Sequence, residues 1–266
     1  VNPIRAGYNA VADEWVGITP GADGLFILAL VHELLKAGKI DLEYLAQYTN
    51  CPVLVNSDPA SPDHGLLLRD DDGKMLVIDR TTGKPAPYDK KGVRPSLSAT
   101  WEKDGITHRP VMHLLAERYL DPAYAPEAVA ERCGVSAAQI KAIAAELARV
   151  AFEEAFELQI PWTDFRGEKH ETMQGRPVSF HSMRGISAHS NGFQTCRSLH
   201  LLQILLGSVE VPGGFRFKPP YPKPVSAHPK PHVKVTPGAP LNGPHLGFVQ
   251  GPDDLALKDE DGRAHV

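Results

Sequence analysis

The segment 181–214 constrains the fold of this chain more than any other stretch. It begins as a polar, glycine-bearing loop, continues as an apolar helix over 195–206, and is expected to end at Gly207. Residues 190–192 are expected to supply the capping and turn chemistry where this helix begins. A loop with His, Arg and Asn before a helix suits an anion such as a phosphate, because the first N–H groups are unpaired and the helix dipole favours negative charge. The alternative, from this segment alone, is a capped core helix.

The overall composition limits the class of protein. The 266 residues fit one large domain or two smaller ones. The net charge of −4 gives no sign of a basic surface for nucleic acid or for a membrane. No apolar run approaches the roughly 20 residues that a membrane span needs. We therefore expect no nucleic-acid partner and no direct insertion into a membrane.

Three cysteines, Cys51, Cys133 and Cys196, lie far apart and form no C-x-x-C pair. This spacing argues against a zinc or iron–sulfur site made by this chain alone, so no metal ligands are predicted. Buried thiols in a reducing compartment are the expectation, which favours a bacterial cytoplasm, with the periplasm as the alternative. The chain begins Val-Asn-Pro without a signal-peptide pattern, and we expect it to be a piece of a longer polypeptide.

Apolar periodicity predicts an α/β chain. Helices are expected over 24–36, 41–48, 112–119, 124–133 and 136–150, with Asp41 and Ser136 as caps and Gly38 and Gly134 as helix ends. Short strands are expected at 15–18 and 178–180, and an irregular segment at 159–177.

Residues 53–110 have a different character. Strand-like runs at 53–55 and 75–78 flank the turn signal Asp70-Asp71-Asp72-Gly73, which predicts a small antiparallel β insertion. At the other end, eleven of the 24 prolines lie between Pro212 and Pro252. This density excludes a regular helix or a central strand and predicts an extended segment or linker over 217–266.

Three groups of motifs resemble one family. Near the start, the matching residues are Val1-Asn2-Pro3-Ile4-Arg5, Ala12-Asp13, Pro20-Gly21-Ala22-Asp23 and Tyr48-Thr49. Later matches are Val135-Ser136-Ala137-Ala138-Gln139-Ile140, Ala188-His189-Ser190-Asn191-Gly192, Leu202-Gln203-Ile204-Leu205-Leu206-Gly207 and Val211-Pro212-Gly213-Gly214. Together these resemble the molybdopterin oxidoreductases of the DMSO reductase family. The amino-acid sequence of segments 162–164 and 183–192 is most similar to that of the branch of sulfite dehydrogenases and polysulfide or thiosulfate reductases.

The resemblance implies a domain organisation and a function. It implies a Rossmann-like domain over 1–180 that binds molybdopterin guanine dinucleotide, with 53–110 as its β insertion. Residues 181–216 would be a loop–helix segment of a neighbouring α/β domain. The implied cofactor is a bis(molybdopterin guanine dinucleotide) molybdenum centre, used for two-electron or oxygen-atom transfer on a small substrate such as a sulfur oxyanion.

The resemblance also implies binding residues. Asp23 would accept the guanine N1–H and N2 amino groups in a charge-assisted pair; the alternative is a plain N-cap of helix 24–36. Asn2 stands at a strand end, where the family usually has an Asp that binds the ribose hydroxyls. An Asn side chain can still hydrogen-bond a hydroxyl, but it carries no negative charge. Arg184 would face a phosphate or an oxyanion substrate. The residues that would face pyrophosphate or pterin are His189, Ser190, Asn191 and Gly192. The alternative for His189 is a buried structural histidine.

The resemblance assigns no catalytic residue to this chain, although Arg184 and His189 are candidate contacts to substrate or cofactor. In the family the iron–sulfur cysteines and the molybdenum ligand lie upstream of the matching segment, and none of the three cysteines is at the corresponding place. The chain is expected to supply part of a cofactor cradle and to be inert by itself. The implied partners are an iron–sulfur electron-transfer subunit, together with a membrane anchor subunit. The alternative function is a non-catalytic nucleotide-binding or assembly module.

Overall fold

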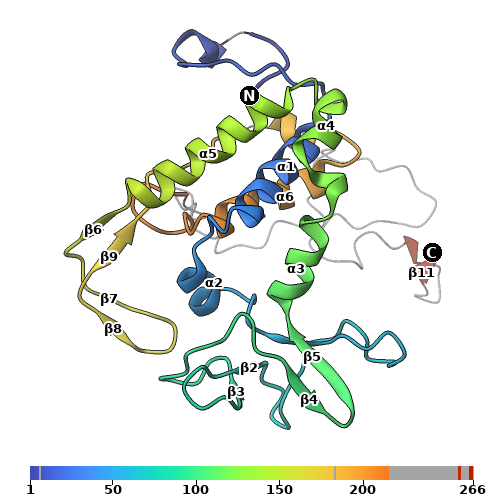
Figure 1. The fold of residues 1–266 in the computed structure, drawn as a ribbon, viewed down its shortest axis with the longest axis vertical. Helices are drawn as coiled ribbons and strands as arrows, with labels where there is room; N and C mark the ends of the chain where they lie inside the picture. The colour runs from blue at the N-terminus through green and yellow to red at the C-terminus, as the bar shows by residue number, and fades with distance from the viewer. Residues whose placement is uncertain (6, 183, 216–256, 259–263, 266) are drawn as a thin grey trace. The chain divides into compact units, whose positions relative to one another are not determined.

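A computed structural model describes residues 1–215 apart from 6 and 183, together with 257–258 and 264–265 (Figure 1). The chain divides into two compact units, Val1–Phe217 and Lys218–Val266. In the second unit the described residues form one antiparallel pair, β10 (Leu257–Lys258) with β11 (Ala264–His265). The remainder of the predicted extended segment 217–266 lies outside the described residues.

Six helices form the framework of the first unit, and the predicted helices are confirmed. They are α1 (Asp23–Lys36), α2 (Leu42–Tyr48), α3 (Val111–Tyr119), α4 (Pro126–Cys133), α5 (Ala137–Glu153) and α6 (Gly192–Leu205). The predicted caps are present, because Asp41 accepts from the Tyr44 amide at 3.0 Å and Ser136 accepts from the Gln139 amide at 3.2 Å. Short 3-10 turns are η1 (Gly7–Ala10), η2 (Pro122–Tyr124) and η3 (Arg184–Ser187). None of the described helices is long and apolar enough to cross a membrane.

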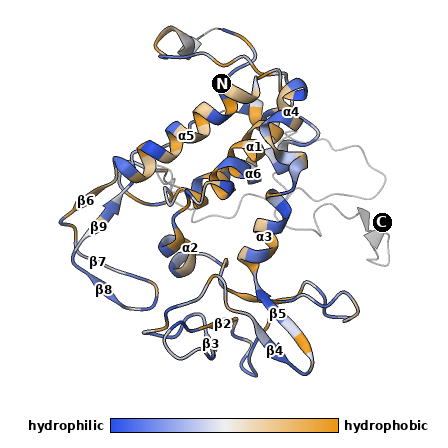
Figure 2. Ribbon diagram, viewed as in Figure 1, coloured by the Kyte–Doolittle hydropathy of each residue, from blue (hydrophilic) through white to orange (hydrophobic). Residues whose placement is uncertain are grey.

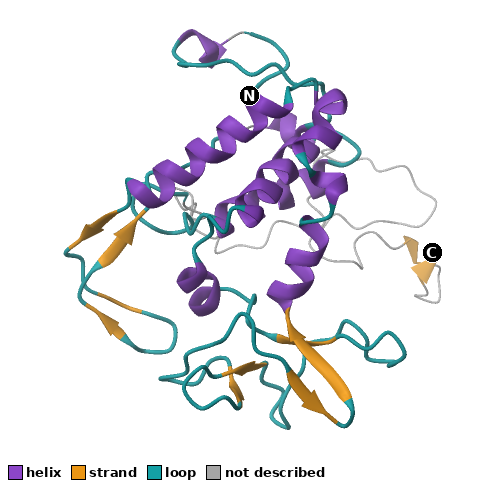
Figure 3. Cartoon of the chain, in the orientation of Figure 1, coloured by secondary structure: helices purple, strands orange, loops and turns teal. Residues whose placement is uncertain are grey.

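The hydrophobic core forms around α1, which packs against α3, α4, α5 and α6 (Figures 1 and 3). Apolar residues gather along these helices, whereas the outer hairpins are mostly hydrophilic (Figure 2). Ala29, Val31, Leu202 and Leu205 have no exposed surface. Burial of each Val or Leu side chain stabilises the fold by about 1.5–3 kcal/mol.

Helices α1 and α6 run side by side in the same direction. At their starts, a methyl group on Gly24 would lie 3.0 Å from the Thr195 hydroxyl oxygen. At their ends, the amide of Asp41 donates to the carbonyl of Leu205 at 2.8 Å. Both helices have 14 residues, or about 21 Å. Their N-termini therefore lie together, with no large side chain between them at Gly24.

The predicted antiparallel β insertion is confirmed. One sheet has the order β1 (Leu54–Asn56), β5 (Ile106–Pro110), β4 (Trp101–Lys103), and β2 (Leu76–Ile78) pairs with β3 (Pro85–Pro87). The turn at 70–73 forms as predicted, because the Asp70 carboxylate accepts from the amides of Asp72 and Lys74. Val53, Val77 and Val93 make a small core of their own.

Two predicted strands are wrong. Residues 15–18 and 178–180 have irregular backbone, although Val16, Ile18 and Val178 are buried. Their apolar side chains pack against the helices, and the amide of Val178 bonds locally to the carbonyl of Arg176. The alternation predicted burial correctly, but burial does not require a neighbouring strand.

The segment 159–177, expected to be irregular, contains short paired strands. Two antiparallel pairs form an arm over 156–175, with β6 (Phe156–Leu158) on β9 (Met173–Gly175) and β7 (Trp162–Thr163) on β8 (Lys169–His170). The mixed α/β class is thus confirmed. Every pairing between named strands of the described residues is antiparallel, so the Rossmann-like arrangement stays a prediction. Helix α6 shares one core with α1.

A largely buried ion pair joins the helix ends away from the N-termini of α1 and α6. The Arg176 guanidinium bonds to the Asp41 carboxylate and donates to the carbonyl of Ala151 at 2.8 Å. It also lies 4.9 Å from the centre of the Phe152 ring. The two charged side chains are only 11% and 14% exposed. We call this arrangement the Arg176–Asp41 clamp; it connects the end of α5 with the start of α2.

Replacing Arg176 by Met is expected to destabilise the fold by about 3 kcal/mol, because it leaves the largely buried Asp41 carboxylate without its cation. The matched control is Lys74→Met, which breaks a pair with Asp89 whose side chains are about half exposed. We expect no measurable loss for the control. Urea unfolding followed by circular dichroism gives both free energies, and equal losses would contradict the role of the clamp.

The cysteines differ in accessibility. Cys51 and Cys133 are buried as expected, but Cys196 is partly exposed. Burial raises the pKa of the Cys51 and Cys133 thiols, so little of the reactive thiolate is present near neutral pH. We expect iodoacetamide at pH 8 to label Cys196 in the folded chain, and the other two only after denaturation. Peptide mass spectrometry separates the three sites; rapid labelling of Cys133 in the folded chain would be inconsistent with this core.

Candidate functional site

The two motif-bearing segments meet at the adjacent starts of α1 and α6. The side-chain amide of Asn191 donates to the carbonyl of Gly21 at 3.1 Å, across 170 residues of sequence. A methyl group on Gly21 would lie 3.6 Å from Nδ1 of His189. We call this region, residues 20–23 and 189–192, the junction. It places Asp23, His189, Ser190, Asn191 and Gly192 in one neighbourhood.

Asp23 is the first residue of α1 and is half-buried. The N-cap residue is Ala22, and no side chain caps the helix. Within the described part of the chain, the Asp23 carboxylate has neither a hydrogen bond nor an ion pair. The alternative expectation, a plain N-cap, is therefore wrong. The carboxylate can accept hydrogen bonds from a ligand.

The start of α6 differs from the prediction. The helix begins at Gly192, three residues before the predicted start, and Asn191 stands at the N-cap without capping it. The Asn191 amide binds Gly21 instead, so capping by residues 190–192 is wrong. The amides of Phe193 and Gln194 donate to no oxygen of the described residues. The first turn has no acidic side chain. This end of α6 therefore carries unneutralised positive potential.

The loop before α6 presents its polar side chains to solvent. His189, Ser190 and Arg184 are exposed, which excludes a buried structural role for His189. Gly192 is buried, and a methyl group there would lie 2.2 Å from the carbonyl oxygen of Ser187. Turn η3 therefore packs closely against the start of α6, which only glycine permits, and it carries Arg184 beside the junction.

Asn2 lies apart from these residues. Its backbone amide donates to the carbonyl of Val16 at 3.0 Å, and its carbonyl accepts from the Trp15 indole at 2.9 Å. Its exposed side chain has no partner in the described residues. No contact brings Asn2 to the junction, and its ribose role stays a prediction.

One cluster was missed by the sequence reasoning. Asp164, Glu168 and His170 bring ligand-type atoms within 4.8 Å of one another on the arm. Their oxygens are already occupied: Asp164 accepts from the amides of Arg166 and Glu168, and Glu168 from the Gly92 amide and the Arg94 side chain. Burial raises the pKa of Asp164, but these amides and the His170 ring outweigh it and lower the pKa overall. The close spacing of these three residues in the sequence could have indicated the cluster. Their carboxylate oxygens, however, accept hydrogen bonds from groups of the chain itself, which argues against a metal site.

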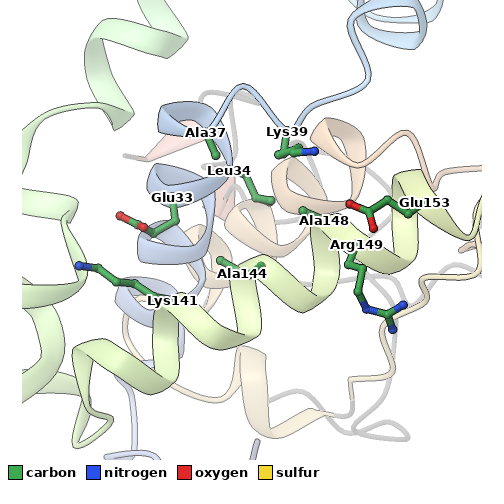
Figure 4. A pocket seen from close by; sticks show the side chains of 10 residues that line it. Glu33, Leu34, Ala37, Lys39, Lys141, Ala144, Ala148, Arg149 and Glu153 are labelled. Atoms are coloured by element: carbon green, nitrogen blue, oxygen red, sulfur yellow. The ribbon is translucent and has the colours of Figure 1, made fainter.

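A groove of about 300 Å³ lies along the contact between α1 and α5 (Figure 4). Leu34, Ala144 and Ala148 lie between the two helices, and charged side chains stand along the rim. The charged residues are Glu33, Lys39, Lys141, Arg149 and Glu153. No predicted site residue lines this groove, so it is separate from the junction.

Comparisons with known proteins agree with the motifs. No protein-family model matches the chain. Over 99% of its length it is 42% identical to a sulfite dehydrogenase subunit of Allochromatium vinosum, of which it spans 28%. It is 30% identical over 56% of its length to a protein of Halobacterium salinarum named as a dimethyl sulfoxide reductase catalytic subunit, and 27% identical over 80% to the nitrate-inducible formate dehydrogenase major subunit of Escherichia coli. It spans 18% of each of these two. The resemblance to molybdopterin oxidoreductases is confirmed.

The close approach of α1 and α6 at Gly24 can be tested by substitution. Gly24→Val is expected to destabilise the fold by about 1–3 kcal/mol, because its methyl groups collide with Thr195 in a packed interface. Gly185→Val is the control, since a side chain at Gly185 has no atom within 4 Å. Thermal unfolding of both variants measures the difference. A Gly24→Val variant as stable as the control would contradict the close approach.

Proposed function

We propose that this chain, a relative of molybdenum-containing oxidoreductase subunits, binds the guanine dinucleotide portion of a bis(molybdopterin guanine dinucleotide) cofactor. The observation that carries the proposal is the junction. A free carboxylate at the start of α1 lies beside the uncapped start of α6. One ligand that matches both chemistries is a guanine nucleotide, which has paired N–H donors at one end and phosphates at the other.

The two halves of such a ligand fit different residues. Asp23 would accept the N1–H and N2 amino hydrogens of guanine, a pair that adenine does not offer. The pyrophosphate would bind the free amides of Phe193 and Gln194, where the helix dipole favours negative charge. Arg184 and His189, both exposed nearby, would add positive or hydrogen-bonding groups. Ser190 would contribute a hydroxyl to the same ligand.

The chain's own residues would bind and orient the cofactor. When bound, the molybdenum centre supplies two-electron or oxygen-atom chemistry. The similarity to a sulfite dehydrogenase subunit supports a sulfur oxyanion as the substrate of the whole protein. A Rossmann-like arrangement around α1, an iron–sulfur cluster outside this chain, and association with separate electron-transfer and membrane anchor subunits belong to the same proposal. The relative's own name, which describes it as one subunit of its enzyme, supports assembly with other chains.

Calorimetry with GDP tests the proposal directly. We expect GDP to bind the chain and ADP to bind at least about tenfold more weakly, because adenine cannot form the pair with Asp23. Asp23→Asn is expected to weaken GDP binding by at least about tenfold and to remove the preference over ADP. Asp71→Asn, an exposed carboxylate in the β insertion, is the matched control and should bind like the wild type.

The outcomes separate the candidate functions. Absence of GDP binding by the wild-type chain would overturn the nucleotide site and leave an assembly role. GDP binding that ignores Asp23→Asn would move the guanine site elsewhere. Selective GDP binding, in a full-length protein that purifies without molybdenum, would favour the alternative of a non-catalytic nucleotide-binding module.

A further inference from the structure

We infer that the end of α4, Cys133–Gly134, is a positioning element that fixes the turn carrying Asp23. The inference rests on the proposed function of Asp23 for its significance. The turn is held in the ligand-free chain as well, so its positioning can be tested separately from binding. The turn, residues 19–23, lies between the end of α4 on one side and the start of α6 on the other.

Helix α4 holds the turn through its last residue. The Thr19 amide donates to the carbonyl of Cys133 at 2.8 Å, and the Ala22 amide donates to the carbonyl of Thr19 at 3.0 Å. The Cys133 thiol lies 3.9 Å from the carbonyl oxygen of Ala22. Cys133 therefore contacts both the start of the turn and the residue that precedes Asp23.

Gly134 makes this contact possible. It adopts the left-handed conformation, with φ 70° and ψ 16°, and ends α4. A methyl group there would lie 2.8 Å from the Thr19 hydroxyl oxygen, while the other nearest atoms, also of Thr19, are 3.6 and 4.0 Å away. The hydroxyl oxygen of Thr19 is therefore the one nearby atom that a side chain at position 134 would collide with. A side chain there forces Thr19 either to rotate or to shift with the turn.

The position of α4 is itself fixed by the core. Val129 and Cys133 have no exposed surface, and both belong to the cluster around α1. The opposite side of the turn is held by Asn191 through the carbonyl of Gly21. Because both sides of the turn are attached to packed helices, the backbone that carries Asp23 is in place before a ligand arrives. Preorganisation of this kind increases affinity by lowering the ordering cost of binding.

The test compares two glycines with the same backbone conformation. Gly134→Ala and Gly38→Ala both place a side chain on a left-handed residue, but nothing lies within 4 Å of position 38. Hydrogen–deuterium exchange of the ligand-free 266-residue chain is the readout. We expect Gly134→Ala to accelerate exchange at the Ala22 and Phe26 amides, and Gly38→Ala to leave them unchanged.

A rescue variant isolates the contact. Thr19→Ala removes the limiting hydroxyl from an exposed side chain, so the double variant Thr19→Ala/Gly134→Ala should regain slow exchange at Ala22 and Phe26. If Gly134→Ala fails to fold, restored folding of the double variant supports the inference. Failure of both, or equal exchange in Gly134→Ala and Gly38→Ala, would overturn it.

GDP binding provides the second readout. Gly134→Ala should weaken GDP binding roughly 3- to 10-fold relative to Gly38→Ala, and the double variant should restore it. If the wild-type chain does not bind GDP, the proposed function fails, while the exchange experiment still decides the positioning role. If exchange changes as expected but GDP affinity does not, Asp23 is positioned for something other than this nucleotide, and the role for binding is rejected.

Discussion

The parallel packing of α1 against α6 is the constraint on which the rest of this structure depends. Two aligned helix dipoles side by side repel each other, so the arrangement needs compensation at both ends. The buried apolar faces supply the attraction. At the C-terminal end of α6 the Asp41 amide donates to the carbonyl of Leu205, and the Asp41 carboxylate is held by Arg176, which also donates to the carbonyl of Ala151 in α5. At the N-terminal ends, Asp23 offsets part of the positive potential of α1 and leaves that of α6 uncompensated.

The β insertion and the arm are attached to each other and to α2 of this framework. The arm joins α2 and the insertion through Arg166, which donates to the side chain of Gln47 and the carbonyl of Tyr88, both at 2.9 Å. The guanidinium also lies over the rings of Tyr88 and Phe165. These contacts explain why a buried cation without a carboxylate partner among the described residues is tolerated there. They make the insertion and the arm one peripheral assembly, structurally separate from the candidate site.

The sequence predicted local features well, because their causes are local. The caps at Asp41 and Ser136 and the turn after Asp70 each depend on a side chain that accepts a hydrogen bond from a backbone amide a few residues later. The strands expected around Val16 and Val178 were wrong because an apolar pattern records burial but not the hydrogen-bond partner. The bond between Asn191 and Gly21 was not predictable from spacing, since it depends on the packing of distant helices. The family motifs indicated that both segments matter, but not that they touch.

That contact joins segments 170 residues apart, with the insertion, the arm and the five helices α1 to α5 between them. The junction can therefore form only when α1 and α6 are docked on each other. A long intervening loop adds little closure entropy, so changes in the length of the insertion should affect the junction weakly. A ligand held across both helix starts would stabilise the folded unit as a whole and not one helix, since neither half of the junction persists in the unfolded chain. Ligand binding at the junction and folding of the core are therefore thermodynamically linked.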